Sequence, residues 1–136
     1  MKVLSVGLVL GSIIVGHAGA VSARVALQDD AVIEDGLQIV ATGRMLIKGC
    51  DAISPRRLRA FSFVRSLQKR ARDLGYSDAE IDQYLDSDRD KDRVKAKARK
   101  YLEARGVNFN EPATLCSVGL SEIQAETTVG RFLWSK

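Results

Sequence analysis

Residues 54–85 read SPRRLRAFSFVRSLQKRARDLGYSDAEIDQYL, and this stretch predicts two helices joined by a hinge of one residue. Pro55 suits the first turn of a helix, where its missing N–H is not needed, and Ser54 is a favourable cap in front of it. Gly75 can adopt the left-handed conformation that commonly ends helices. We therefore expect a helix over 55–74 and a second helix that starts directly after Gly75.

The two helices differ in how strongly the sequence marks them. In the first helix, apolar residues recur three or four positions apart and predict one buried face, formed by Leu58, Phe61, Val64, Leu67, Ala71 and Leu74. In the second, Ser77 and Glu80 have the spacing of a capping box, and Tyr76 and Ile81 have that of a hydrophobic staple. The second helix is therefore expected to begin at Asp78 and to continue to about residue 85.

An amphipathic helix is also predicted over residues 29–48. It opens with two aspartates, which favour a helix start, and its apolar residues fall near one face: Ile33, Leu37, Val40 and Ile47. Gly36 and Gly43 lie on one side, where they either permit the close approach of a neighbouring helix or are simply tolerated. A strand over 37–47 is the competing interpretation, which we rank lower.

Residues 86–92 alternate acidic and other side chains, as a calcium-binding loop does. The sixth loop position holds Lys91 where glycine is needed, and the twelfth holds Lys97 where glutamate is needed. The stretch is better interpreted as the acidic start of a fourth helix, capped by Ser87 or Asp88, whose cations gather toward its end. Its apolar stripe is thin, which predicts a surface helix lying on the others.

A fifth helix is predicted after a loop over residues 107–112, with Asn110 or Glu111 as its cap. Its apolar stripe includes Cys116, which would therefore point toward the core. Cys50 follows the end of the first helix, and a Cys50–Cys116 disulfide would close a loop of about 67 residues and stabilise the fold by ~4 kcal/mol. A redox-active thiol is the alternative, but it usually has a C-x-x-C motif or a neighbouring histidine.

The N-terminus has the layout of a secretory signal peptide. A lysine gives a positive start, an uncharged run covers residues 3–16, and residues 18–20 form an Ala-x-Ala site. We expect cleavage after Ala20, or as late as Ala23, which leaves a single helical domain over 21–136 with no transmembrane helix. A retained anchor is the alternative, although the run is shorter than the ~20 residues that span a bilayer. The mature protein would be periplasmic or secreted, where disulfides form.

Cleavage of the signal peptide would remove His17, the one histidine of the chain. Without an imidazole there is no Ser-His-Asp triad, no Cys-His pair and no histidine metal ligand. Two cysteines are too few for a four-thiolate zinc or iron–sulfur site. We therefore expect a protein without metal or cofactor, and not an enzyme.

Charge and aromatic content indicate where a partner could bind. The predicted helix over 55–74 has seven basic residues: Arg56, Arg57, Arg59, Arg65, Lys69, Arg70 and Arg72. A basic helix followed by a turn and a second helix is typical of DNA-binding proteins, but an exported chain does not meet DNA, and a solvated helix face is the plainer explanation. The net charge of +4, about +3 after cleavage, predicts weak attraction to anionic surfaces.

The candidate partner surface therefore has two parts. One is the basic face with Arg65, Lys69 and Arg72, and the other is the apolar tail with Phe132 and Trp134. A tail of this kind usually packs as a last core anchor, and an exposed partner-binding tail is the alternative.

Several short segments follow one another along the mature chain: CDAIS at 50–54, an arginine-rich helix, LGYSDAEI at 74–81, YL and RGV within 101–107, and the segment 112–116. This order resembles a family of small exported proteobacterial proteins of unknown function. Some relatives carry a respiratory-complex (NADH dehydrogenase) subunit label, although this chain lacks a cluster-binding cysteine set and a nucleotide-binding glycine motif. The resemblance implies no catalytic residues.

Together, these features predict an all-α domain, a bundle of four or five helices with one disulfide. The first functional hypothesis is a non-enzymatic binding or accessory protein of the cell envelope, whose partner is an envelope protein or an anionic surface. The second is a carboxylate-dependent hydrolase or lyase of envelope glycans, acting through an acid such as Glu80 or Glu103. A buried glutamate beside a cleft would favour this, although Glu80 is better explained as a cap. A third, a peripheral subunit of a respiratory complex, depends only on the family label.

Overall fold

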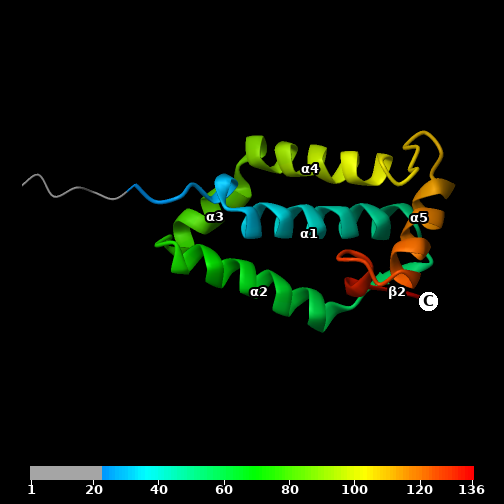
Figure 1. Ribbon diagram of the computed structural model, residues 1–136, viewed down its shortest axis with the longest axis horizontal. Coiled ribbons are helices and arrows are strands. Elements are labelled where there is room, and N and C mark those ends of the chain that lie inside the picture. The colour runs from blue at the N-terminus through cyan, green and yellow to red at the C-terminus, as the bar shows by residue number, and fades with distance from the viewer. Residues whose placement is uncertain (1–22) are drawn as a thin grey trace, which may run out of the picture.

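The computed structural model describes residues 23–136, so the predicted signal peptide over 1–20, including His17, lies outside the described residues. The described chain forms five α-helices, two short 3-10 helices and two three-residue strands (Figure 1). The elements run in the order η1 (Leu27–Asp29), α1 (Ala31–Gly49), β1 (Ile53–Pro55), α2 (Arg57–Asp73), α3 (Asp78–Asp86), α4 (Asp88–Glu103), α5 (Ala113–Gln124), η2 (Gly130–Phe132) and β2 (Leu133–Ser135). The predicted all-α fold of four or five helices is confirmed.

Helix α1 is the centre of the fold. It lies between α4 on one side and α2 on the other, α5 crosses its C-terminal end, and α3 lies near its N-terminal end (Figure 1). A large core cluster surrounds the C-terminal end of α1 and includes Leu46, Leu102 and Leu133, and a smaller cluster at the other end includes Ile33 and Ile81. The alternative of a strand over 37–47 is wrong, because these residues lie inside α1. As a helix, the segment packs against α2 and α4 on two different sides.

The helix starts agree with the local capping chemistry in three places. Asp30 caps α1 by accepting from the amide of Ile33 at 3.1 Å, so the helix starts at Ala31, two residues later than the predicted start at residue 29. Ser77 and Glu80 form the predicted capping box at the start of α3. Ser87 caps α4, which resolves the choice between the two predicted caps. Caps succeed as predictions because their partners lie within three residues.

The predicted start of the second helix is wrong. Ser54 does not cap a helix, and Pro55 does not open one, because both belong to strand β1, which pairs antiparallel with β2. Ser54 lies opposite Trp134, and the amide of Arg56 donates to the carbonyl of Phe132 at 2.7 Å. Helix α2 therefore starts at Arg57 without a side-chain cap. No local pattern indicates this ribbon, since its two strands lie about 80 residues apart in the chain.

The predicted apolar face of α2 is also partly wrong. Leu67 and Ala71 are buried, but Leu58 is 86% exposed and Phe61 60% exposed. Steps of three residues fall about 60° short of a full helical turn, so nine residues from Leu58 to Leu67 turn the side chain to the opposite side. Repeated spacing of three therefore produced an apparent stripe that winds around the helix.

Helix α4 does more than cover the surface, since it runs along α1 and fully buries Ala98 and Leu102 against it. Of the two interpretations left open for Gly36, the structure has the close approach of a neighbouring helix, because a Cβ there would lie 2.5 Å from a methyl carbon of Leu67 in α2. Gly43 has no such contact, since its nearest neighbour would lie at 3.9 Å.

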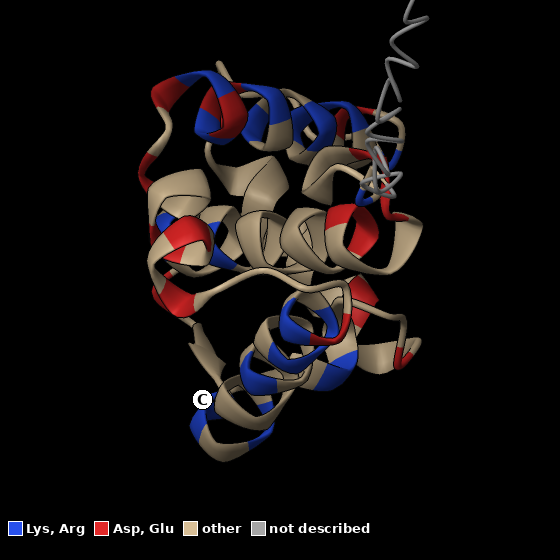
Figure 2. Ribbon diagram, turned by 90° about the vertical axis from the view of Figure 1, so that its left-hand side faces the viewer, with Lys and Arg blue, Asp and Glu red and all other residues tan. Residues whose placement is uncertain are grey.

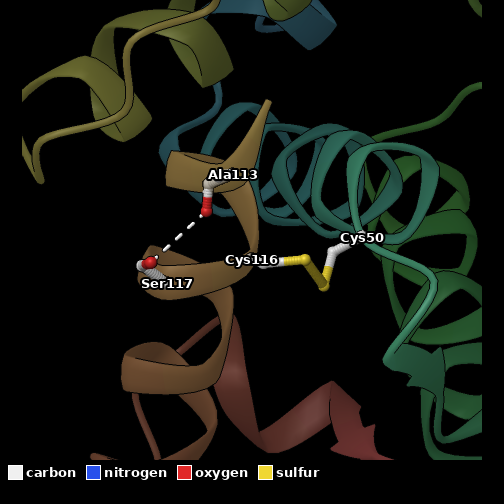
Figure 3. The surroundings of a disulfide bond; sticks show 4 residues. All are labelled: Cys50, Ala113, Cys116 and Ser117. Atoms are coloured by element: carbon white, nitrogen blue, oxygen red, sulfur yellow. Dashed lines mark hydrogen bonds between the residues drawn. A yellow bond between two sulfur atoms is a disulfide. The ribbon is translucent and has the colours of Figure 1, made fainter. Parts of the chain in front are cut away.

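The predicted disulfide is confirmed. Cys50 follows the last residue of α1 and is bonded to Cys116 in α5, with a Cα–Cα distance of 4.9 Å (Figure 3). The predicted caps of α5 are wrong, since the helix starts at Ala113 with Pro112 at the cap position and no side-chain cap. The hydroxyl of Ser117 instead donates to the carbonyl of Ala113 within the helix (Figure 3).

The C-terminal tail is divided between core and surface. Leu133 is 2% exposed and joins the large core cluster, as a core anchor should, whereas Trp134 is 45% exposed. Alternation along strand β2 explains this, because successive side chains of a strand point to opposite faces.

Candidate binding groove

An open groove of about 580 Å³ lies over α1, between α2 and α4. Its lining is mostly apolar, with Leu37 and Val40 from α1, Val64 and Leu67 from α2, and Val94 from α4. Helices α2 and α4 both pack on α1, one on each side (Figure 1), and Ile81, Tyr84 and Leu85 of α3 complete the lining of the groove. Its volume is in the range of pockets that bind small molecules, about 300–1,000 Å³.

Basic side chains border this groove. Arg44 and Lys48 lie one turn apart on α1, and Lys91 and Lys95 lie one turn apart on α4. Within residues 23–136, Arg44, Lys48 and Lys95 take part in no ion pair. The one acidic lining residue, Asp90, already receives a hydrogen bond from Arg93. The border of the groove is therefore positively charged and available to an anion.

A buried ion cluster fastens α4 to the N-terminal half of α1. Glu34 is 4% exposed and accepts from Arg93 and, at 2.9 Å, from Lys97. Arg93 also donates to Asp90 and to the hydroxyl of Tyr84. Burial by itself raises the pKa of Glu34, but the two cations outweigh this and hold the pKa below its usual value. Glu34 therefore links α1 to α4 through its ion pairs with Arg93 and Lys97.

A second buried carboxylate ties α5 to the end of α4. Glu122 is 5% exposed and is held by the hydroxyls of Tyr101 and Thr127 and by Arg105, whose Nε lies 2.7 Å from the carboxylate. Burial and this carboxylate raise the pKa of Tyr101. Tyr101, Thr127 and Arg105 bind the carboxylate of Glu122, which does not line the groove.

The two glutamates considered for catalysis have ordinary structural roles. Hydrogen bonds from Arg24 and from the amide of Ser77 lower the pKa of Glu80 to about 2, so this side chain stays ionised. Glu103 is exposed and lies 3.7 Å from Arg99, one turn earlier in α4. Neither residue lines the groove. In residues 23–136, no group of three or more histidine, cysteine, aspartate or glutamate side chains could hold a metal ion.

The five residues predicted as a partner surface do not form one patch. Arg65, Lys69 and Arg72 lie on the exposed side of α2, whereas the tail is attached to the other end of that helix. Phe132 is half-buried, with its ring 4.7 Å from that of Phe63, and Trp134 lies in β2. The structure therefore brings the aromatic tail to the start of α2, away from the basic residues at its end.

Sequence reasoning missed both the groove and the exposed apolar residues of α2. The groove depends on the angle at which three helices meet, which local patterns do not encode. The exposure of Leu58 and Phe61 could have been found, because their angular position on a helix follows from 100° per residue.

These features define a small, disulfide-linked helical domain with an apolar groove and a basic border. The chain belongs to the Family of unknown function (DUF5333), whose model matches residues 25–134. Membership of a family of unknown function was expected, whereas proteobacterial origin and the respiratory label stay predictions. Neither the comparison with curated proteins nor that with solved structures gives a match. Among the described helices, none has the length and apolar character required to cross a bilayer.

Proposed function

We propose that this protein is a non-enzymatic binding protein of the cell envelope, and that its ligand is a single-chain amphiphile with an anionic head group, such as a long-chain fatty acid. The observation that carries the proposal is the groove over α1, which joins an apolar lining to a basic border. An apolar chain gains free energy by leaving water for the groove, and an anionic head group gains from the nearby cations.

The positions of the cations favour an elongated ligand. Arg44 and Lys48 follow the groove on α1, and Lys91 and Lys95 follow it on α4, so positive charge accompanies the apolar surface along two of the helices that line the groove. A ligand whose acyl chain lies in the groove would keep its head group within reach of the basic pair on α1 or of the basic pair on α4. The disulfide supports the envelope location, because such bonds persist in oxidising compartments.

The test is isothermal titration calorimetry with tetradecanoate and with its uncharged methyl ester. We expect saturable 1:1 binding of the acid and affinity about tenfold lower for the ester, which lacks the charge. Ala41→Phe, which places a ring in the floor of the groove, should abolish binding. Ala96→Phe is the matched control, since Ala96 is an exposed alanine of α4 outside the groove.

Charge is tested by a second matched pair. Lys95→Glu should weaken tetradecanoate binding, and Lys100→Glu, on the same helix but outside the groove, should leave it unchanged. Equal affinity for acid and ester, or equal loss in Ala41→Phe and Ala96→Phe, contradicts the proposal. The carboxylate-hydrolase alternative is less well supported, since Asp90, the one acidic residue that lines the groove, is already paired with Arg93.

A further inference from the structure

The exposed side of α2 has an unusual composition. Five residues spaced three or four apart fall within about 80° of the helix circumference, and we call them the outer stripe: Leu58, Phe61, Arg65, Lys69 and Arg72. The stripe begins with two large apolar side chains that are 86% and 60% exposed. Leu58 is the most exposed large hydrophobic residue in the described part of the chain. Such exposure of neighbouring apolar residues usually marks an interaction site.

The charges around these two apolar residues are all positive. Arg57 precedes Leu58, and Arg65 lies over the ring of Phe61, with its guanidinium carbon 5.5 Å from the ring centre. Arg57 and Arg65 form no ion pair with any described residue. At the other end of the stripe, Lys69 pairs with Asp73 and Arg72 with Asp78, each at 2.7 Å. The free positive charge is therefore concentrated beside the exposed apolar residues.

Helix α2 lies at the edge of the molecule, where no other described element covers the stripe. In Figure 2 it is the lowest helix, it carries basic residues along much of its length, and the C-terminus lies beside it. Arg131 and Lys136 add positive charge at this end of the protein, because Arg59 donates to the carbonyl of Arg131 and the tail pairs with β1.

We propose that the outer stripe of α2 docks the protein onto the surface of an anionic phospholipid bilayer, with Leu58 and Phe61 inserted between the lipids and the arginines at the phosphate groups. This goes beyond ligand binding in the groove and depends on a different face. Helices that lie in the membrane interface typically combine leucine and phenylalanine with neighbouring lysine and arginine. Basic side chains near an anionic leaflet add attraction that salt weakens.

The positive charge of the outer stripe complements anionic lipid, which favours a bilayer over the groove of another protein as the surface that the stripe contacts. The two apolar side chains are separated by one turn and stand on a convex helix, so they can enter lipid without needing a matching cavity. The basic helix α4 provides an internal comparison, since it has a similar set of lysines and arginines but none of the exposed large hydrophobic residues. Helix α4 also contains four acidic residues, whereas α2 contains one, so the net positive charge of α2 is larger as well.

The test is sedimentation of the full chain with large unilamellar vesicles, either of phosphatidylcholine alone or with phosphatidylglycerol at equal amounts. We expect binding to the anionic vesicles, little binding to the neutral ones, and loss of binding in high salt. Leu58→Ser with Phe61→Ser should weaken binding at least about tenfold. Arg65→Glu should weaken it more than Lys100→Glu, the control of equal charge change on α4.

All variants share the same N-terminal segment, so its contribution is the same in every comparison between variants. Because the replaced residues are exposed, each variant should keep the circular-dichroism melting curve of the parent, which separates lost docking from lost folding. Equal binding to neutral and anionic vesicles overturns the proposal. So does unchanged binding in the Leu58→Ser/Phe61→Ser variant, or an equal effect of Arg65→Glu and Lys100→Glu. Absence of vesicle binding overturns it as well.

Discussion

The disulfide allows the stability of this fold to be predicted in quantity. We consider the replacement of Cys50 and Cys116 by alanine. The bridge joins residues separated by 66 positions, and closing a loop of that length lowers the entropy of the unfolded chain by an amount worth about 4 kcal/mol at 25 °C. Because domains of this size are stable by about 5–15 kcal/mol, the double variant should lose a large share of its stability.

Urea unfolding followed by circular dichroism measures this loss. For an m-value of about 1.5 kcal/mol/M, the midpoint should fall by between about 2 and 3 M urea. The wild-type protein in reductant is the control, because it keeps both sulfur atoms in the core but lacks the cross-link. It should lose nearly as much as the alanine variant, and the remaining difference reports the packing of Cys50, which is 2% exposed.

Two results would refute this reasoning. A loss of less than about 1 kcal/mol on reduction would mean that the unfolded chain is not restrained as the loop-closure argument requires. Two titratable thiols in the protein, unfolded without reductant, would show that the bridge does not form.

Three further predictions concern packing and pH. Leu67→Ala should lower the free energy of unfolding by about 2–5 kcal/mol, because Leu67 is buried, as measured by urea unfolding. Leu58→Ala should change it by less than about 0.5 kcal/mol, because Leu58 is exposed. Equal losses would contradict the winding of the apolar residues around α2. Leu133→Ala should also cost about 2–5 kcal/mol and separate the tail from the core, which faster exchange of the β2 amides would report. The pKa of Glu80 is lowered from 4.5 to about 2 by Arg24, so its contribution to stability is complete above pH 4.5 and lost as the pH falls to about 2. The difference in stability between wild type and Glu80→Gln should therefore shrink over that interval, and a constant difference would contradict the Arg24 contact.

Acid sensitivity should extend beyond Glu80. Hydrogen bonding with Arg70 lowers the pKa of Asp30, and the hydrogen bond with Ser87 together with Arg93 lowers that of Asp90. Each of these groups stabilises the folded protein when ionised, by the same sign argument. These contributions share one direction, so unfolding should become easier as the pH falls below the ordinary range of carboxylates.

The sequence by itself determined the helices, most of their ends and the covalent link. Gly75 with φ +90°, the Ser77–Glu80 capping box and the Ser87 cap act over three residues or fewer, so the information for them is contiguous in the chain. The disulfide was predictable because only two cysteines are present, Cys116 lies on the apolar stripe of its predicted helix, and Cys50 directly follows the end of another.

Tertiary structure alone decided the β1–β2 ribbon, the side of α2 that faces water and the groove. Pro55 is a good first residue for a helix, yet pairing with the C-terminal tail places it in a strand, because ladder hydrogen bonds and burial of Leu133 outweigh a local preference. The groove follows from how α2 and α4 flank α1, which depends on contacts such as that of Gly36 with Leu67. Local sequence patterns specify which faces are apolar, but the relative placement of helices arises only from packing between distant segments.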